Sequence, residues 1–112
     1  MDIPTKVQSV ARTVEHHTGK SWDELCGPGR GQRISLVRKM AATALRELNP
    51  DMSLRDIRQA LGGRDHSTVV YWMRTIKQIV EEDVMYRGIM QTILEESRDR
   101  HEVYAESPAT VS

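Results

Sequence analysis

The chain has 112 residues, which is enough for one compact domain and excludes a second large one. Hydrophobic residues make up 38% and charged residues 29% of the sequence, a balance typical of a globular protein rather than a disordered one. Phenylalanine is absent, so aliphatic side chains and six methionines must fill most of the core, which favours an all-α fold. Cys26 is the single cysteine and excludes an intramolecular disulfide; we expect it to pack at a helix end.

The charges are balanced overall but unevenly distributed along the chain. Sixteen basic and sixteen acidic residues give a formal net charge of zero, yet residues 30–77 carry ten basic and four acidic groups. Residues 78–112 carry three basic and eight acidic groups. The basic middle segment can still present a positive face to phosphate, because the charges of the acidic segment 78–112 are largely screened beyond about 8–10 Å. Ordinary solvated surface is the alternative explanation of the same charges.

The N-terminal half of the sequence predicts helices separated by a glycine-rich loop. Helical spacing over residues 3–17 predicts a first helix, Ser21 is a candidate N-cap for a short turn with Trp22 and Leu25, and residues 27–31 predict a loop that carries Arg30. From Gln32 a further helical pattern extends to Leu48, where Asn49-Pro50 ends it.

The following segment predicts two helices joined by a tight turn. Ser53 is an N-cap with Asp56 in a capping-box position, Gly62-Gly63 ends the first helix, and Asp65 caps a second. This outline is that of a helix-turn-helix, whose second helix enters the major groove of DNA. The two glycines alone are weak evidence. The donors and acceptors gathered in the second helix's first turn strengthen the interpretation.

The C-terminal segment has an apolar pattern of its own. The apolar phase changes after Val84, which predicts a break within residues 83–88, a helix over residues 85–104 and a flexible tail over 105–112. Met85, Ile89, Met90 and Ile93 form one stripe on this helix. We expect the stripe either to fold back onto the domain of residues 1–84 or to pair with a second copy as a homodimer.

The helix-turn-helix segment also carries a contiguous motif. The run Gly62-Gly63-Arg64-Asp65-His66-Ser67-Thr68-Val69, with the preceding helix from Ser53, resembles the signature of the C-terminal DNA-binding domain of the bacterial replication initiator DnaA. The resemblance extends over roughly residues 3–80, whereas the initiator's ATPase domain is absent from this sequence. It implies a small Trp-repressor-like helical fold that binds double-stranded DNA.

The resemblance also implies roles for individual residues. Major-groove readers of base edges would be Asp65, His66, Ser67 and Thr68. Arg30 would enter the minor groove at an A·T stretch, where a narrow groove concentrates negative potential. Phosphate contacts, which give affinity rather than sequence choice, would come from a basic and polar set: Arg38, Lys39, Arg46, Ser53, Arg64 and Arg74.

Some residues depart from the family pattern. The loop is poorer in basic residues than the family's, and Gln32 replaces a further loop contact. Arg58 stands where the family usually has a glycine, either to reach a phosphate or to remain solvated. Tyr71 lies on the outer face of its predicted helix, where it can touch the DNA backbone, whereas Trp72 is expected in the core.

Enzymatic and metal-binding interpretations fail on geometry. Asp65, His66 and Ser67 are the residue types of a catalytic triad, but neighbours on a helix point about 100° apart and cannot form its relay. Gly19-Lys20-Ser21 resembles the end of a phosphate loop, but Val14 stands where the first glycine of that motif belongs and no predicted strand precedes it. The histidines and Cys26 show no zinc-ligand spacing. We therefore expect no catalysis, metal, cofactor or small-molecule substrate.

Together these features predict a sequence-specific DNA-binding protein. Sites similar to DnaA boxes are the expected target, with a role as a transcriptional regulator or as a modulator of replication initiation. No apolar run reaches the roughly 18 residues that cross a bilayer, and no signal-peptide pattern opens the chain, so we expect a cytoplasmic, nucleoid-associated protein without membrane contact. The alternative is a protein-interaction module that keeps the fold and binds a partner through its C-terminal helix.

Overall fold

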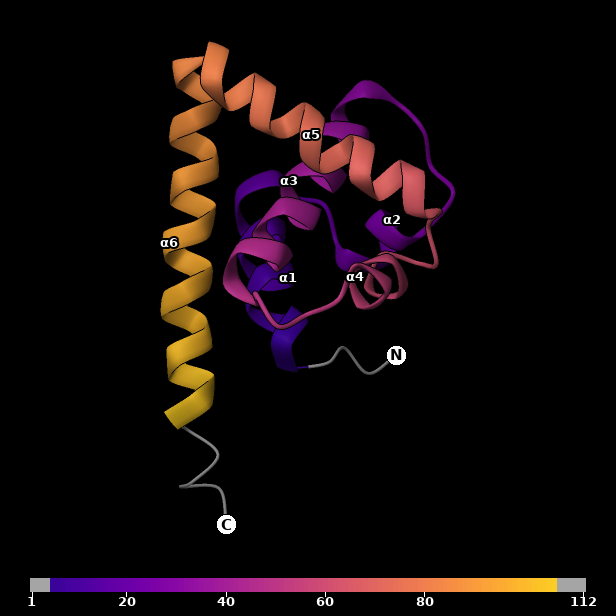
Figure 1. Ribbon diagram of the computed structural model, residues 1–112. Helices are drawn as coiled ribbons and strands as arrows, with labels where there is room; N and C mark the ends of the chain where they lie inside the picture. Colours follow the sequence, from indigo (N-terminus) through magenta and orange to yellow (C-terminus); the bar gives the residue numbers. More distant parts are fainter. Residues whose placement is uncertain (1–4, 107–112) are drawn as a thin grey trace.

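The structure, a computed structural model, describes residues 5–106, and their side chains from Lys6 to His101. This range contains six α-helices and no strand (Figure 1). The all-α expectation is confirmed. In chain order the helices are α1 (Thr5–Thr18), α2 (Trp22–Cys26), α3 (Gln32–Leu48), α4 (Leu54–Ala60), α5 (His66–Glu82) and α6 (Val84–Glu106).

Helix α3 forms the centre of the molecule. Helices α1, α5 and α6 all pack against it, and its buried residues include three alanines, Ala41, Ala42 and Ala44, whose small side chains suit close helix packing. The fully buried side chains of the surrounding helices include Val10 of α1, Ile57 of α4 and Ile76 of α5. Each of these side chains lies on the buried apolar face of its helix.

Short capping motifs fix where the small helices begin. The hydroxyl oxygens of Ser21 and Ser53 accept hydrogen bonds from the backbone N–H groups of Glu24 and Asp56, and each acidic side chain accepts from the serine N–H in return. Both motifs are therefore capping boxes. They satisfy backbone donors that a helix of only five or seven residues would otherwise leave unpaired.

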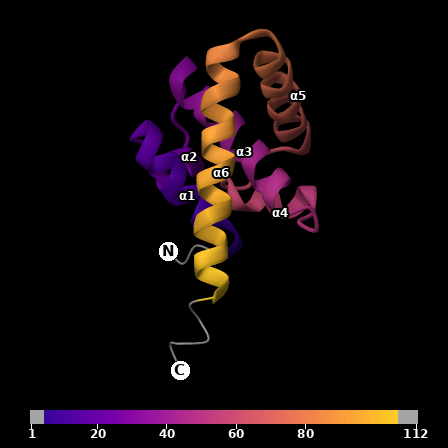
Figure 2. The ribbon, with the colours of Figure 1, turned by 90° about the vertical axis from the view of Figure 1, so that its left-hand side faces the viewer.

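The predicted break after α5 occurs at Asp83. Its N–H still donates to Ile79 at the end of α5, while its carboxylate accepts from the N–H groups of Met85 and Tyr86 at the start of α6. Figure 2 shows α6 running alongside the rest of the molecule after this corner. With 23 residues it spans about 35 Å, so it sets the long dimension of 44 Å.

Helix α6 folds back onto the other helices. Met90 and Ile93 are buried, and α6 packs against α1, α3 and α5. Polar contacts add to this packing: the His17 ring bonds the Glu96 carboxylate, and Arg100 donates to the Thr13 hydroxyl over 3.3 Å. The apolar stripe is split between the core, where Met90 and Ile93 are buried, and the surface, where Met85 and Ile89 are exposed, so pairing with a second copy stays open for the exposed part. Helix α6 continues through residues 105 and 106, two residues beyond the expected boundary, and residues 107–112 of the expected tail lie outside the described residues.

None of the helices described between residues 5 and 106 is long and apolar enough to cross a membrane.

Candidate nucleic-acid interface

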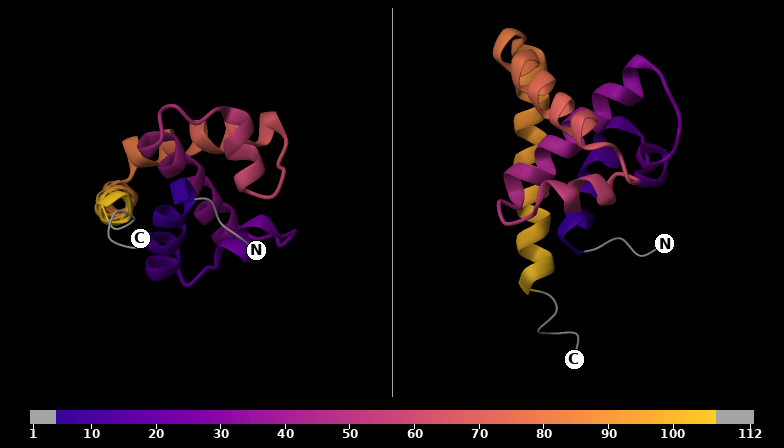
Figure 3. Two further views of the ribbon diagram at one scale, coloured as in Figure 1. Left: turned by 90° about the horizontal axis from the view of Figure 1, so that it is seen from below. Right: turned by 45° about the vertical axis from the view of Figure 1, so that its right-hand side comes forward.

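Helices α4 and α5 form a helix-turn-helix around two glycines. Gly62 and Gly63 both have positive φ angles, 89° and 79°, which L side chains rarely adopt. The backbone N–H groups of Gly63 and Arg64 donate to the Arg58 carbonyl over 2.9 and 3.2 Å. The turn therefore satisfies the Arg58 carbonyl near the end of α4 and leads the chain into α5. Figure 3 shows this part of the ribbon from two further sides.

The first turn of α5 presents polar side chains to solvent. Asp65 occupies the N-cap position in an extended conformation, but its carboxylate makes no capping hydrogen bond. Asp65, His66 and Ser67 are exposed, and Thr68 is half-buried. A helix N-terminus carries partial positive charge and unpaired N–H groups, so these side chains stand where a phosphate backbone would be attracted.

Arg30 lies in the loop between α2 and α3. It is exposed, and Gly31, with a φ of 136°, redirects the chain into α3. Figure 1 shows this loop on the same side of the molecule as the N-terminal end of α5, with α6 on the opposite side. A contact from Arg64 to the Gly27 carbonyl joins the loop to the helix-turn-helix. The loop and the first turn of α5 thus belong to one surface.

Arg38 does not point to solvent. It is 6% exposed, and its guanidinium donates to four carbonyl oxygens at the end of α2 and in the loop: Glu24, Leu25, Gly27 and Gly29. Burial lowers the pKa of Arg38, and the nearby charge of Arg64 lowers it further. The guanidinium of Arg38 is therefore hydrogen-bonded within the protein, whereas its sequence position predicts a phosphate contact.

Arg64 is half-buried and is also turned toward the protein. Its Nε donates to the Leu61 carbonyl over 3.0 Å, and its Nη2 donates to the carbonyls of Leu25 and Gly27. Its guanidinium also lies 5.9 Å from the centre of the buried Trp72 ring, within the range of a cation–π contact. This arrangement too differs from the phosphate contact expected of Arg64.

The remaining residues of the expected phosphate set are accessible. Arg46 and Arg74 are exposed, although Arg46 also donates to the Met52 carbonyl over 2.9 Å. Ser53 is exposed at the N-cap of α4. Lys39 is half-buried, with its ammonium 5.4 Å from the centre of the Tyr71 ring. These four positions remain available to a polyanion.

Sequence reasoning missed the role of Arg58. Its Nε donates to the Arg64 carbonyl over 2.8 Å, so it holds the turn between α4 and α5 rather than being free in solvent. Tyr71 is 58% exposed on α5, and Trp72 is buried, both as the helical pattern predicts. A helical wheel places each side chain correctly here. It does not indicate which backbone carbonyl accepts a hydrogen bond from a long side chain such as Arg58.

Cys26 is a packing residue at the end of α2. Its thiol donates to the Ala60 carbonyl over 3.3 Å. Burial raises the pKa of this thiol; the charge of Arg64 opposes that shift, Asp23 adds to it and Arg38 opposes it. A thiol that ionises less readily than usual is a poor nucleophile. Among the side chains that the structure describes, no three histidines, cysteines or carboxylates gather where they could hold a metal ion.

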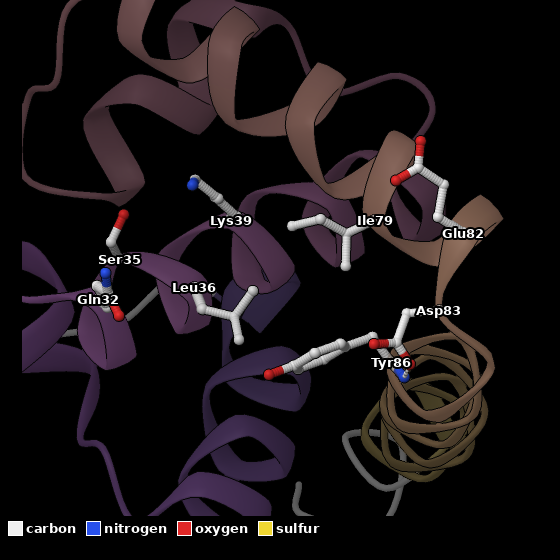
Figure 4. A pocket seen from close by; sticks show the side chains of 8 residues that line it. All are labelled: Gln32, Ser35, Leu36, Lys39, Ile79, Glu82, Asp83 and Tyr86. Atoms are coloured by element: carbon white, nitrogen blue, oxygen red, sulfur yellow. Dashed lines mark hydrogen bonds between the residues drawn. The ribbon is translucent and has the colours of Figure 1, made fainter.

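A groove of about 630 Å³ lies away from the first turn of α5, where α3 meets the corner between α5 and α6 (Figure 4). Leu36, Ile79 and Tyr86 supply its apolar lining. Lys39 lies toward one end, while Glu82 and Asp83 lie at the other (Figure 4). These carboxylates make that end unfavourable for a polyanion.

Comparison with known proteins agrees with this architecture. Residues 7–76 match the family described as bacterial dnaA protein helix-turn-helix. The chromosomal replication initiator protein DnaA of Thermus thermophilus is 37% identical over 86 residues, covering 77% of this chain and 20% of that protein. The DnaA of Thermomicrobium roseum is 40% identical over 79 residues, covering 70% of this chain and 17% of that protein.

A solved structure supports the fold independently. The crystal structure of a DNA replication initiation factor superposes with a TM-score of 0.71 at 19% identity, covering 86% of this chain and 30% of the other. The chain therefore spans about a fifth of the length of the DnaA relatives and shares the fold of this larger factor. Because the family match covers well over half of its residues, the chain belongs to the bacterial DnaA helix-turn-helix family.

Proposed function

We propose that this chain binds double-stranded DNA at specific sequences, with the first turn of α5 in the major groove and Arg30 in the minor groove. The observation that carries the proposal is the exposed polar cluster Asp65, His66 and Ser67 at the N-terminus of a helix-turn-helix recognition helix. An imidazole and a carboxylate can exchange hydrogen bonds with base edges there. Thr68, half-buried behind them, would present its methyl group to a thymine methyl.

The distribution of charge supports the same orientation. Lys39, Arg46 and Arg74 would contact phosphates, together with the hydroxyl of Ser53. Helix α6, whose sequence carries acidic residues, lies across the molecule from the N-terminal end of α5 (Figure 1). An acidic helix on the far side leaves the positive face available, because charges more than about 10 Å away are largely screened.

The expected target is a site similar to a DnaA box. By occupying such sites in the cytoplasm, on the nucleoid, the protein would regulate transcription or modulate replication initiation. This function is binding without catalysis and requires no cofactor, metal or small-molecule substrate. It follows from the family and from the residues of the proposed interface.

Selection from a random duplex library, followed by titration of the selected site, tests the proposal. The selected duplex should bind at least a thousandfold more tightly than a scrambled one at physiological salt. Log affinity should fall with log salt by about 0.9 for each phosphate contacted. Undetectable binding to any duplex at low salt would reject DNA binding, and equal binding to selected and scrambled duplexes would reject sequence specificity.

Exposed apolar side chains on α6 favour a second candidate function, contact with another protein. Val84 is 75% exposed, Met85 61% and Ile89 37%. We propose that the partner is a second copy of the chain, since a helix-turn-helix monomer covers few base pairs and a two-fold dimer doubles the contacts on a palindrome. Met85 and Ile89 are the part of the apolar stripe that the fold leaves uncovered, and Val84 extends this exposed surface.

Sedimentation of the full chain and of the double variant Met85→Glu, Ile89→Glu tests the homodimer. A dimer that becomes a monomer in the variant supports it, with circular dichroism as the check on its fold because Ile89 is only 37% exposed. A full chain that is monomeric at micromolar concentration would reject the homodimer. A dimer that resists both substitutions would place the interface elsewhere.

A further inference from the structure

Arg38 and Arg64 meet on the same two carbonyl oxygens. Arg38 donates to Leu25 over 2.9 Å and to Gly27 over 2.7 Å. Arg64 donates to Leu25 over 2.9 Å and also to Gly27. Two positive side chains, one from α3 and one from the turn of the helix-turn-helix, therefore converge on the C-terminal end of α2, at Leu25 in its last turn and at Gly27 just after it. The last carbonyls of a helix have no N–H partner within the helix itself.

The two arginines use most of their donors on the protein. A guanidinium has five N–H donors, and three nitrogens of Arg38 supply bonds to four carbonyls. The like charges repel each other, and the negative ends of the carbonyl dipoles between them offset that repulsion. Such charge-assisted hydrogen bonds are short and directional, so they fix the geometry of the groups that they join.

Each arginine lies beside a residue that we propose to contact DNA, Arg38 through a hydrogen bond and Arg64 through the chain. Arg38 donates over 2.6 Å to the carbonyl of Gly29, the residue before Arg30. Arg64 directly precedes Asp65, the first residue of the major-groove cluster. The carbonyls of Leu25 and Gly27 thus connect the loop that carries Arg30 with the turn that begins α5.

We propose that Arg38 and Arg64 are positioning residues that fix Arg30 relative to the first turn of α5, so that the two grooves of DNA are read in one register. We call the two side chains, with the carbonyls of Leu25 and Gly27, the arginine clasp. The inference rests on the proposed function, because it assigns the clasp to the same interface. It replaces phosphate binding as the role of these two arginines.

The test is the variant Arg64→Lys, alone and combined with Arg30→Ala. Lysine keeps the charge but presents a single ammonium, which cannot reproduce the bonds from Nε and Nη2 to three carbonyls. Discrimination at the A·T end of the selected site should fall by about fivefold or more, the change typical of one base pair. Adding Arg30→Ala should then cost less than it does in the native chain, because Arg30 is already misplaced.

The matched control is Arg74→Ala, an exposed position on the outer face of α5. It should weaken selected and random duplexes alike, reduce the salt slope by about one and keep the A·T preference. Arg64→Lys should keep the salt slope and lose the preference. If Arg64→Lys instead keeps full discrimination, or if Arg30→Ala costs the same in both backgrounds, the clasp has no positioning role.

A measurement on the native chain tests the clasp even if the arginine variants do not fold. Circular dichroism melting reports whether Arg64→Lys, or Arg38→Lys as its replacement, is folded. In the native chain, the Nε–H proton of Arg38, which donates to the clasp carbonyl of Leu25, should exchange with solvent much more slowly than that of the exposed Arg74. Equal exchange rates at Arg38 and Arg74 would overturn the clasp. A failure of the proposed function is distinguishable, because the native chain would then bind no duplex.

Discussion

The indole N–H of Trp22 donates a hydrogen bond of 2.8 Å to the carbonyl oxygen of Ala60, the last residue of α4. The thiol of Cys26 donates to the same carbonyl. Helix α2, only five residues long, therefore supplies the partners that the end of α4 lacks. Its C-terminus therefore packs directly on the turn of the helix-turn-helix.

Gly62 is the position where this packing leaves no room for a side chain. A Cβ there would overlap the Cys26 carbonyl, and the φ of 89° is itself unfavourable for alanine. Gly62→Ala should lower the free energy of unfolding by more than about 2 kcal/mol, the loss expected from backbone strain plus a steric clash. Urea unfolding followed by circular dichroism measures this change.

Gly63→Ala is the control for Gly62→Ala. Gly63 has a φ of 79°, but a Cβ there meets nothing within 4 Å, so only the backbone cost of about 1–2 kcal/mol applies. The Gly62 variant should be clearly the less stable of the two. Equal losses of stability would mean that the turn does not pack on α2 in solution.

The thiol of Cys26 provides a second test of the same packing. Burial raises its pKa above the ordinary value of 9.0, so the folded state disfavours the thiolate. Iodoacetamide, which reacts with the thiolate, should modify the folded chain at pH 8 several times more slowly than the urea-unfolded chain. Burial of the neutral thiol therefore contributes to stability below pH 9, and this contribution is lost as the pH rises through the pKa of the thiol in the folded state. Equal alkylation rates would contradict the burial.

The sequence predicts the features that depend on local spacing. Ser53 and Asp56 stand three residues apart, and that spacing alone specifies the capping box that begins α4. The change of apolar phase after Val84 predicts the break, which the structure has at Asp83. These features involve residues within a turn or two of each other, so their geometry follows from the helix itself.

Features that depend on packing between distant segments were not predictable in the same way. The acceptors of Arg38 lie at least nine residues earlier, and they are backbone carbonyls whose direction leaves no trace in the sequence. The split of the α6 stripe has a similar origin. Met90 is buried whereas Met85 is 61% exposed, and this difference reflects where the other helices lie along α6.

Two single variants should distinguish residues that read bases from residues that bind phosphate. His66→Ala should weaken the selected site by about 1–3 kcal/mol and blur discrimination at one or two base pairs, because it removes a donor and acceptor from the major groove. Arg46→Ala should weaken selected and random duplexes to a similar extent. Fluorescence anisotropy with labelled selected, singly mismatched and random duplexes gives all of these affinities.

Arg46 also donates to the Met52 carbonyl, so its variant needs a stability control, and Arg74→Ala supplies a phosphate variant without that contact. If His66→Ala loses affinity equally on selected and random DNA, His66 does not read bases. A loss of discrimination in Arg74→Ala would show that the outer face of α5 contributes more than electrostatic attraction.

The last prediction concerns whether α6 is part of the domain or an appendage to it. Ile93 is fully buried, so Ile93→Ala should cost about 2–5 kcal/mol in the free energy of unfolding. Met85→Ala, on the exposed side of the same helix, should change it by no more than about 0.5 kcal/mol. Urea unfolding distinguishes the two. An Ile93 variant as stable as the native chain would mean that α6 separates from the other helices in solution. A single cooperative transition shifted by Ile93→Ala would make α6 an integral element, because a helix that melted independently could not transmit its lost packing to the helix-turn-helix.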